Sequence, residues 1–101
     1  MPTFYKVLTL GDLPPGQGKT VRVGNQTVAV FNVNGRIYAT GNSCVHRGGP
    51  LGEGHLEGTT VTCPWHAWRF DVTTGESQVS PDAKVPTFPV KIEGEDILVG
   101  I

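Results

Sequence analysis

Two short stretches in the middle of this 101-residue chain hold both of its cysteines and two of its three histidines. Residues 44–51 read Cys-Val-His-Arg-Gly-Gly-Pro-Leu, and residues 63–71 read Cys-Pro-Trp-His-Ala-Trp-Arg-Phe-Asp. The Cys-x-His pair suits an extended loop whose alternate side chains converge, and the Cys-x-x-His pair suits a tight turn. Thiolates and imidazoles together select zinc, iron or an iron–sulfur cluster rather than an oxygen-preferring cation. The candidate metal ligands are therefore Cys44, His46, Cys63 and His66.

The grouping of these donors separates two kinds of metal site. Two Cys and two His can bind a structural zinc ion, but common zinc fingers pair Cys with Cys and His with His. Here each loop supplies one of each, so two adjacent loops could offer both thiolates to one iron and both imidazoles to another. An oxidised cluster of two ferric ions, two sulfides, two thiolates and two neutral imidazoles has no net charge, whereas the same cluster with four thiolates is already negative. Reduction of the mixed site is therefore easier, between about −150 and +300 mV against about −400 mV for plant-type ferredoxins.

Around this middle, apolar and polar residues alternate, which is typical of antiparallel β-structure. Gly-Asn and Asn-Gly pairs between alternating segments indicate tight hairpin turns. The predicted elements are an opening strand at Phe4 to Val7, a hairpin from Val21 to Val30 around Gly24-Asn25, a hairpin around Asn34-Gly35 that continues to Ala39, and a hairpin from Val90 to Ile101 around residues 93–96.

Residues 40–72 have a different character, because Gly, Pro, Cys, His and Trp replace the alternation and only residues 59–63 and 68–72 are predicted as short strands. The prolines between Ser77 and Pro89 lack backbone donors, so this stretch predicts a covering loop followed by an edge strand. We therefore expect an all-β fold and a single domain over residues 1–101. A loop-rich subdomain at about 41–72 would be inserted in a β base formed by both termini.

Composition excludes several classes of protein. Hydrophobic residues make up 38% of the chain and charged residues 17%, and the formal net charge is −1, so a basic surface for nucleic acid is not expected. Apolar runs are too short for a membrane-spanning helix. The opening Met-Pro-Thr-Phe-Tyr-Lys does not resemble a secretory signal, which predicts a cytoplasmic protein. Two cysteines are too few for a disulfide scaffold. The small size and balanced charge favour a monomer.

The two ligand stretches resemble the two cluster loops of the Rieske iron–sulfur family. The resemblance rests on the two Cys/His pairs, their separation, Pro50-Leu51 after the first loop and the aromatic-rich strand after the second. It implies a Rieske-like antiparallel β-sandwich or barrel that holds one 2Fe–2S cluster. It further implies that Cys44 and Cys63 bind the inner iron, and that His46 and His66 bind the outer iron near the surface.

The sequence departs from the high-potential members of that family in two respects. Rieske proteins of quinol-oxidising complexes have an additional Cys in each loop, joined in a disulfide, and these loops lack it. They also have a Ser two residues beyond the second His, whose hydroxyl stabilises the reduced cluster, and Trp68 occupies that position here. The resemblance thus implies a potential near the low end of the His-ligated range. Such a centre suits electrons from a flavoprotein that oxidises a nicotinamide, not from quinol.

The size of the chain limits its role. An oxygenase catalytic subunit needs a second large domain with a mononuclear iron, and beyond the candidate ligands only His55 remains, which we expect at the surface. The resemblance implies a ferredoxin without catalytic residues, which carries electrons from a flavoprotein reductase to a terminal oxygenase of the aromatic-ring-hydroxylating type. The residues expected to frame its docking tip are Pro50, Leu51, Pro64, Trp65, Ala67 and Pro81.

Two other functions stay open at this point. The same family includes the small subunit of assimilatory nitrite reductase, whose partner is the nitrite reductase large subunit. From the donor set alone, a zinc-stapled interaction module without a redox role also fits. Visible absorption separates the zinc module from the other two, because iron–sulfur proteins are brown and zinc proteins are colourless.

Overall fold

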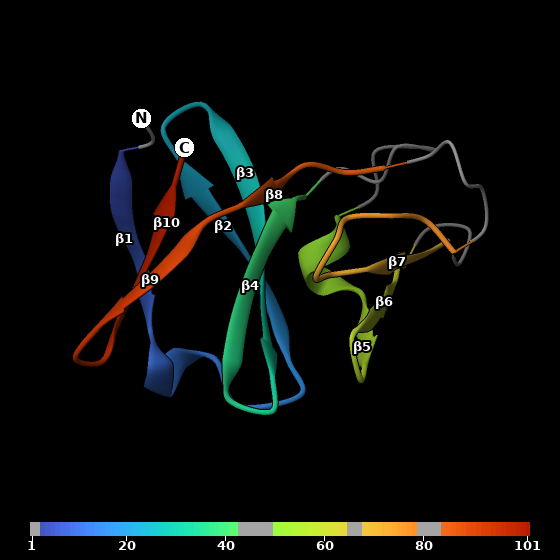
Figure 1. Cartoon of the computed structure of the whole chain (residues 1–101), viewed down its shortest axis with the longest axis horizontal. Helices are drawn as coiled ribbons and strands as arrows, with labels where there is room; N and C mark the ends of the chain where they lie inside the picture. Colours follow the sequence, from blue (N-terminus) through green and yellow to red (C-terminus); the bar gives the residue numbers. More distant parts are fainter. Residues whose placement is uncertain (1–2, 43–49, 65–67, 79–83) are drawn as a thin grey trace.

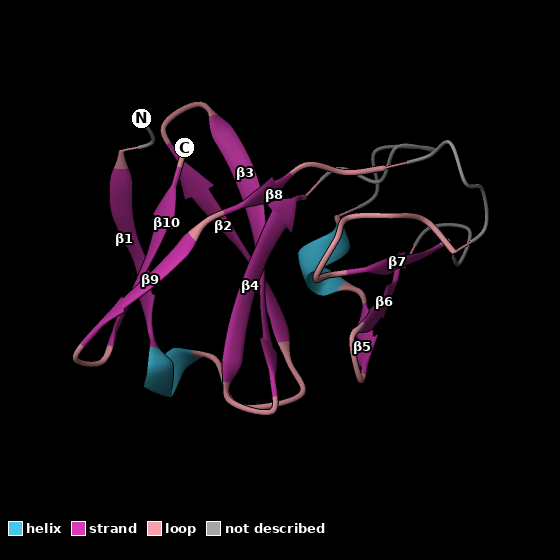
Figure 2. Cartoon of the chain, viewed as in Figure 1, coloured by secondary structure: helices cyan, strands magenta, loops and turns pink. Residues whose placement is uncertain are grey.

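The structure, a computed structural model, describes residues 3–42, 50–64, 68–78 and 84–101. Its described part consists of three antiparallel sheets and two short 3₁₀ helices (Figures 1 and 2). The first sheet has the order β1 (Phe4–Thr9), β10 (Asp96–Gly100), β9 (Val90–Glu93). The second has the order β2 (Gly18–Val23), β3 (Gln26–Val33), β4 (Arg36–Gly41), β8 (Thr87–Phe88). The third has the order β5 (His55–Glu57), β6 (Thr60–Thr62), β7 (Arg69–Asp71), and the helices are η1 (Leu10–Asp12) and η2 (Leu51–Glu53).

The predicted hairpins are present. Val23 pairs with Gln26 across Gly24-Asn25, and Val33 pairs with Arg36 across Asn34-Gly35. Asn34 and Gly35 have φ values of 53° and 94°, the left-handed pair that a type I′ turn requires. The C-terminal hairpin joins Glu93 to Asp96, as expected. Local turn chemistry and alternation are therefore sufficient to place these strands.

The base of the molecule is a sandwich of the first and second sheets. Its core contains alternate residues of β3, β4 and β10 together with residues before and within β2, and the buried members are Leu13, Val23, Val28, Val30, Ile37, Ala39, Ile97 and Val99. The two ends of the described chain lie side by side (Figure 1), because Thr3 and Ile101 exchange backbone hydrogen bonds of 3.1 Å in both directions. Both terminal parts of the chain thus contribute to one base, and the all-β sandwich expected from the sequence is confirmed.

The third sheet packs on the opposite face of the second sheet. Ala29 and Phe31 of β3 point into this second core, whereas Val28 and Val30 point into the first. The other buried members are Leu51, Leu56, Val61, Cys63, Phe70, Val72 and Val85. In Figures 1 and 2, η2 lies between the second sheet and the strands β5–β7. The third sheet falls inside residues 41–72, although those subdomain bounds stay a prediction.

The short strands predicted at residues 59–63 and 68–72 are present as β6 and β7, but three other short elements were not predicted. β5, η1 and η2 have three residues each, which is too short for a hydrophobic period to be recognised. The covering loop predicted for residues 77–89 lies partly outside the described residues, but β8 is an edge strand on β4, as expected. Neither helix in the described part of the chain has the length or the apolar character to cross a membrane.

Gly75 offers a test of the packing around the third sheet. Its φ is +82°, and a Cβ there would meet the carbonyl oxygen of Val85, whereas Gly58, at φ +62°, has no atom within 4 Å of that position. We expect Gly58→Ala to lower the free energy of unfolding by about 1–2 kcal/mol, the cost of left-handed backbone. Gly75→Ala should cost roughly 1–3 kcal/mol more through overpacking. Urea titrations followed by circular dichroism measure both, and equal losses would contradict the close approach.

Candidate metal centre

Of the four predicted ligands, Cys63 belongs to the described part of the chain. It directly follows β6 and is 1% exposed, among the apolar side chains of the second core. Cys44, His46 and His66 lie outside the described residues, so their role as ligands stays a prediction. What the structure does describe is how both ligand loops begin and end.

The second loop is closed at its base by one backbone hydrogen bond. Cys63 donates its N–H to the carbonyl of Trp68 at 2.7 Å, directly beyond the last β6–β7 pair, Thr62 with Arg69. Cys63 is therefore held in position by the same ladder that builds the hairpin. Pro64, which is exposed, follows it and has no N–H that could compete for the carbonyl.

The first loop is closed in the same way. Leu51 donates its N–H to the carbonyl of Asn42 at 2.7 Å, and Gly52 donates its N–H to the side-chain Oδ1 of Asn42 at 2.8 Å. Asn42 is 7% exposed and also accepts a hydrogen bond of 3.1 Å from the hydroxyl of Thr20 on β2. The sequence analysis did not identify Asn42, since a single Asn before a Gly-rich loop carries no signal of long-range contacts.

The bases of the two loops meet in one buried cluster. Leu51, at the end of the first loop, and Cys63, at the start of the second, both belong to the second core together with Phe70 and Val85. Side chains in such cores are close-packed, so a displacement at the base of one loop would also displace the base of the other. The fold thus brings residues 51 and 63 together even though a strand pair separates them in the sequence.

The chain beyond β7 adds a third support. The side chain of Asp71 accepts hydrogen bonds from Thr73, from its N–H at 2.8 Å and its hydroxyl at 2.6 Å, which fixes the turn after β7. Gln78 then donates its N–H to the carbonyl of Arg69 at 2.8 Å, and Val85 donates to Gly75 at 2.8 Å. Gln78, before segment 79–83, is therefore anchored to β7, and Val85, after it, to the turn that follows β7.

Trp68 occupies the position where the resemblance implies a Ser in high-potential proteins. Its side chain is half-buried and packs against the second core, and its ring centroid lies 6.5 Å from that of Phe70 at an interplanar angle of 32°. This arrangement is core packing, which is common for a large aromatic side chain. An indole at this position has no hydroxyl to donate.

The residues expected to frame a docking tip have different environments. Leu51 is fully buried in the second core, where its N–H bonds to the carbonyl of Asn42, so its predicted place on an exposed docking tip is wrong. Pro50 is half-buried and Pro64 exposed, as a rim requires. Trp65, Ala67 and Pro81 lie outside the described residues. His55 is exposed on β5, as predicted.

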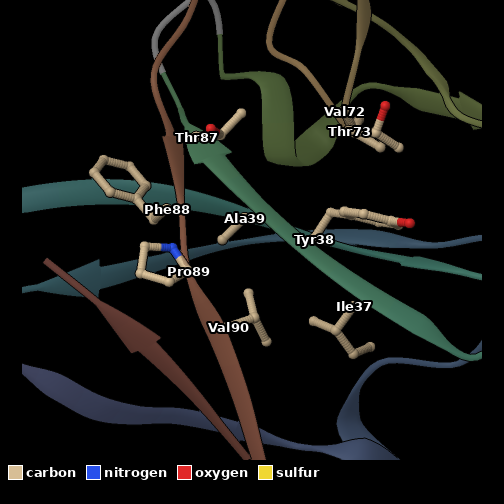
Figure 3. A pocket seen from close by; sticks show the side chains of 9 residues that line it. All are labelled: Ile37, Tyr38, Ala39, Val72, Thr73, Thr87, Phe88, Pro89 and Val90. Atoms are coloured by element: carbon tan, nitrogen blue, oxygen red, sulfur yellow. The ribbon is translucent and has the colours of Figure 1, made fainter. Parts of the chain in front are cut away.

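A separate pocket of about 390 Å³ lies where β8 and β9 diverge from β4 (Figure 3). Six of its nine lining residues have apolar side chains, and its side-chain hydroxyls come from Tyr38, Thr73 and Thr87. Figure 3 shows the hydroxyl of Tyr38 pointing away from Phe88 and Pro89. None of the lining residues is a Cys, His, Asp or Glu, so the phenol of Tyr38 is the pocket's one acid/base side chain.

The described residues fit a metal centre with a sulfur ligand. A buried Cys at the base of a backbone-closed loop, in an apolar core, is a soft donor shielded from water. Such a shell also limits solvent access and contributes to the potential of the metal. The chain would supply the remaining donors from Cys44, His46 and His66.

Comparison with known proteins relates the chain to one family. Residues 3–89 match the Rieske [2Fe-2S] domain family. The chain is 41% identical over 91 residues to the ferredoxin component of the naphthalene 1,2-dioxygenase/salicylate 5-hydroxylase systems of Ralstonia sp., covering 89% of this chain and 88% of that protein.

Solved structures agree in fold and size. The ferredoxin of carbazole 1,9a-dioxygenase from Nocardioides aromaticivorans IC177 is 32% identical, with a TM-score of 0.89 and 96% of each chain covered. A chain in the complex of reduced oxygenase and oxidized ferredoxin of carbazole 1,9a-dioxygenase is 34% identical, with a TM-score of 0.85, covering 99% of this chain and 94% of that one. Small subunits described as those of nitrite reductases, at 21% and 23% identity, share the fold alone.

The ligand role of Cys63 can be tested by metal analysis. We expect Cys63→Ala to lose essentially all bound metal, because the remaining loop donors cannot replace a buried thiolate. His55→Ala is the matched control, since His55 is exposed on β5 and should retain the wild-type content. Metal and acid-labile sulfide are measured per folded chain, with folding checked by circular dichroism. Wild-type metal content in folded Cys63→Ala would refute the assignment.

Proposed function

Because this chain belongs to the Rieske [2Fe-2S] domain family, we propose that it is the ferredoxin of an aromatic-ring-hydroxylating oxygenase system, a one-electron carrier that accepts electrons from a flavoprotein reductase. One cluster would be held by Cys44, His46, Cys63 and His66 within the single domain 1–101. In this proposal the protein is no enzyme itself; it acts as a cytoplasmic monomer without nucleic-acid or membrane partners.

One structural observation carries the proposal. Leu51 and Cys63, which end the first ligand loop and start the second, pack in one buried core, and each loop is closed by a backbone hydrogen bond of 2.7 Å. The arrangement supports two loops held side by side, as the paired Cys/His motifs require. When bound, a 2Fe–2S cluster supplies storage for one electron between the two partners.

The residues of this chain have distinct tasks in that role. Cys63 would ligate from the apolar side, where the second core excludes water. His46 and His66 would ligate on the outer side, where a partner protein can approach. Pro50 and Pro64 would form part of the rim around them. The chain therefore needs no substrate pocket, and the pocket where β8 and β9 diverge from β4 has no part in this function.

The choice of partner rests on the relatives. The ferredoxin components at about 40% identity belong to dioxygenase systems, and a structurally similar chain occurs in a complex of oxygenase and ferredoxin. The likeness to nitrite reductase small subunits shows the fold alone. Thus no specific observation favours a nitrite reductase large subunit as partner, or a zinc-stapled interaction module.

Spectroscopy and electron transfer test the function together. The isolated protein should be brown and give a paramagnetic signal after dithionite reduction, and His46→Ala and His66→Ala should lose both while His55→Ala keeps them. The reduced protein should then be reoxidised in stopped-flow mixing with the oxygenase component of a naphthalene-type dioxygenase. A colourless zinc protein, or faster transfer to a sirohaem nitrite reductase than to the oxygenase, would overturn the proposal.

Trp68 predicts the direction of a change in potential. We expect Trp68→Ser to raise the midpoint potential, because a hydroxyl at this position can donate to a cluster sulfur and stabilise the reduced state. A hydrogen bond to a charged group is worth about 1.5–3 kcal/mol, which for one electron is roughly 65–130 mV. Trp68→Ala is the control, since it removes the indole without adding a donor. Redox titrations in which both variants shift alike would contradict the hydrogen-bond explanation.

A further inference from the structure

Asn42 accepts hydrogen bonds from three residues that are distant in the sequence. It directly follows β4 and stands two positions before Cys44 in the sequence. Its carbonyl accepts from Leu51, and its side-chain Oδ1 accepts from both Gly52 and Thr20, at 2.7, 2.8 and 3.1 Å. One buried residue therefore joins the start of the loop, the end of the loop and strand β2.

The orientation of the Asn42 amide follows from its partners. The N–H of Gly52 can only donate, so the atom facing it must be the oxygen of the side chain. Because Asn42 is 7% exposed, loss of Oδ1 would leave the Gly52 N–H without its acceptor in a buried environment. Unsatisfied buried donors are costly, so the clamp resists opening.

The end of the loop is also wedged against the base. Gly52 packs so closely on β2 that a Cβ there would lie 2.6 Å from the Thr20 hydroxyl and 2.7 Å from the Thr20 nitrogen. A Cβ on Gly18 would in turn lie 3.2 Å from the carbonyl oxygen of Gly52 and 2.6 Å from the ring of Phe31. The close approach therefore fixes the distance between the segment that follows the first loop and strands β2 and β3.

We propose that Asn42 is a positioning residue for the cluster. By tying residues 51 and 52 to residue 42 and to β2, it would hold the two ends of the first ligand loop beside the core that contains Leu51 and Cys63. The inference rests on the proposed function for the cluster, but the clamp itself is built from described residues alone. Partners that orient metal ligands affect both metal retention and potential.

Asn32 provides a matched control within the same chain. It is 4% exposed, and its side chain makes two hydrogen bonds. Its Nδ2 donates to the carbonyl of Leu13 at 2.7 Å, and its Oδ1 accepts from the N–H of Gly35 at 2.7 Å. These bonds stabilise the base and the β3–β4 turn, not a ligand loop. Asn32→Ala therefore reports the general cost of losing a buried Asn.

The test compares cluster retention with global stability. We expect Asn42→Ala to bleach about tenfold faster than wild type in the presence of an iron chelator, the factor that a lost hydrogen bond of ordinary strength produces. The same variant should shift the g values of the reduced protein. Asn32→Ala should destabilise the fold but stay within about twofold of the wild-type bleaching rate, with unchanged g values.

A conservative variant and a local probe complete the experiment. Asn42→Asp keeps an acceptor for both donors and should restore slow bleaching. Hydrogen exchange over residues 51–54, followed by mass spectrometry, should accelerate in Asn42→Ala and not in Asn32→Ala. The proposal is overturned if Asn42→Ala retains wild-type bleaching and g values, or if Asn32→Ala bleaches equally fast at the same melting temperature.

Two further outcomes have a defined meaning. If Asn42→Ala does not fold, Thr20→Val replaces it, since this variant removes one of the two bonds to Oδ1 and leaves Asn42 in place; wild-type bleaching and g values in Thr20→Val would then overturn the proposal. If the wild-type protein holds zinc instead of a 2Fe–2S cluster, the proposed function fails. The exchange experiment on residues 51–54 would still decide whether Asn42 clamps the loop.

Discussion

Strand β3 is the constraint on which the rest of the structure depends. Four consecutive residues, Val28 to Phe31, are completely buried, because the strand lies between two hydrophobic cores. Its even-numbered side chains fill the base, and its odd-numbered ones support the part that carries the ligand loops. A slip of one residue would exchange the two sets, so the register of β3 with β2 and β4 fixes both cores at once.

This constraint explains how a small domain can hold two ligand loops steadily. Each loop begins and ends at a residue that is tied by hydrogen bonds or packing to an element of the sandwich: Asn42 and Leu51 for the first, Cys63 and Trp68 for the second. Fixing the ends of a loop removes much of its conformational freedom before any metal binds. The buried amide of Asn42 fixes the ends of the first loop, whereas that of Asn32 stabilises the base and the β3–β4 turn.

The arrangement supports the proposed role as an electron carrier. The apolar surroundings of Cys63 shield its side chain from water, and backbone hydrogen bonds tie the described ends of both ligand loops together. Trp68 packs against the same core, where a hydroxyl would favour the reduced state. Relatives of this chain that belong to dioxygenase systems share its length and fold, in keeping with a carrier that functions through its partners.

Much of this protein follows from the sequence, because the signals are local. Hairpin turns at Gly24-Asn25 and Asn34-Gly35 need only residues that accept positive φ, and the Cys/His pairs are short motifs whose donor chemistry is evident. The burial of Leu51, the three-residue strand β5 and the clamp at Asn42 could not be predicted in this way. They depend on which segments meet after folding: Leu51 follows a ligand motif but packs with Cys63 and Phe70, and Asn42 bonds with Thr20, twenty-two positions away. Only tertiary structure determines such contacts, since hydrogen bonds and packing between distant segments leave no periodic trace in the chain.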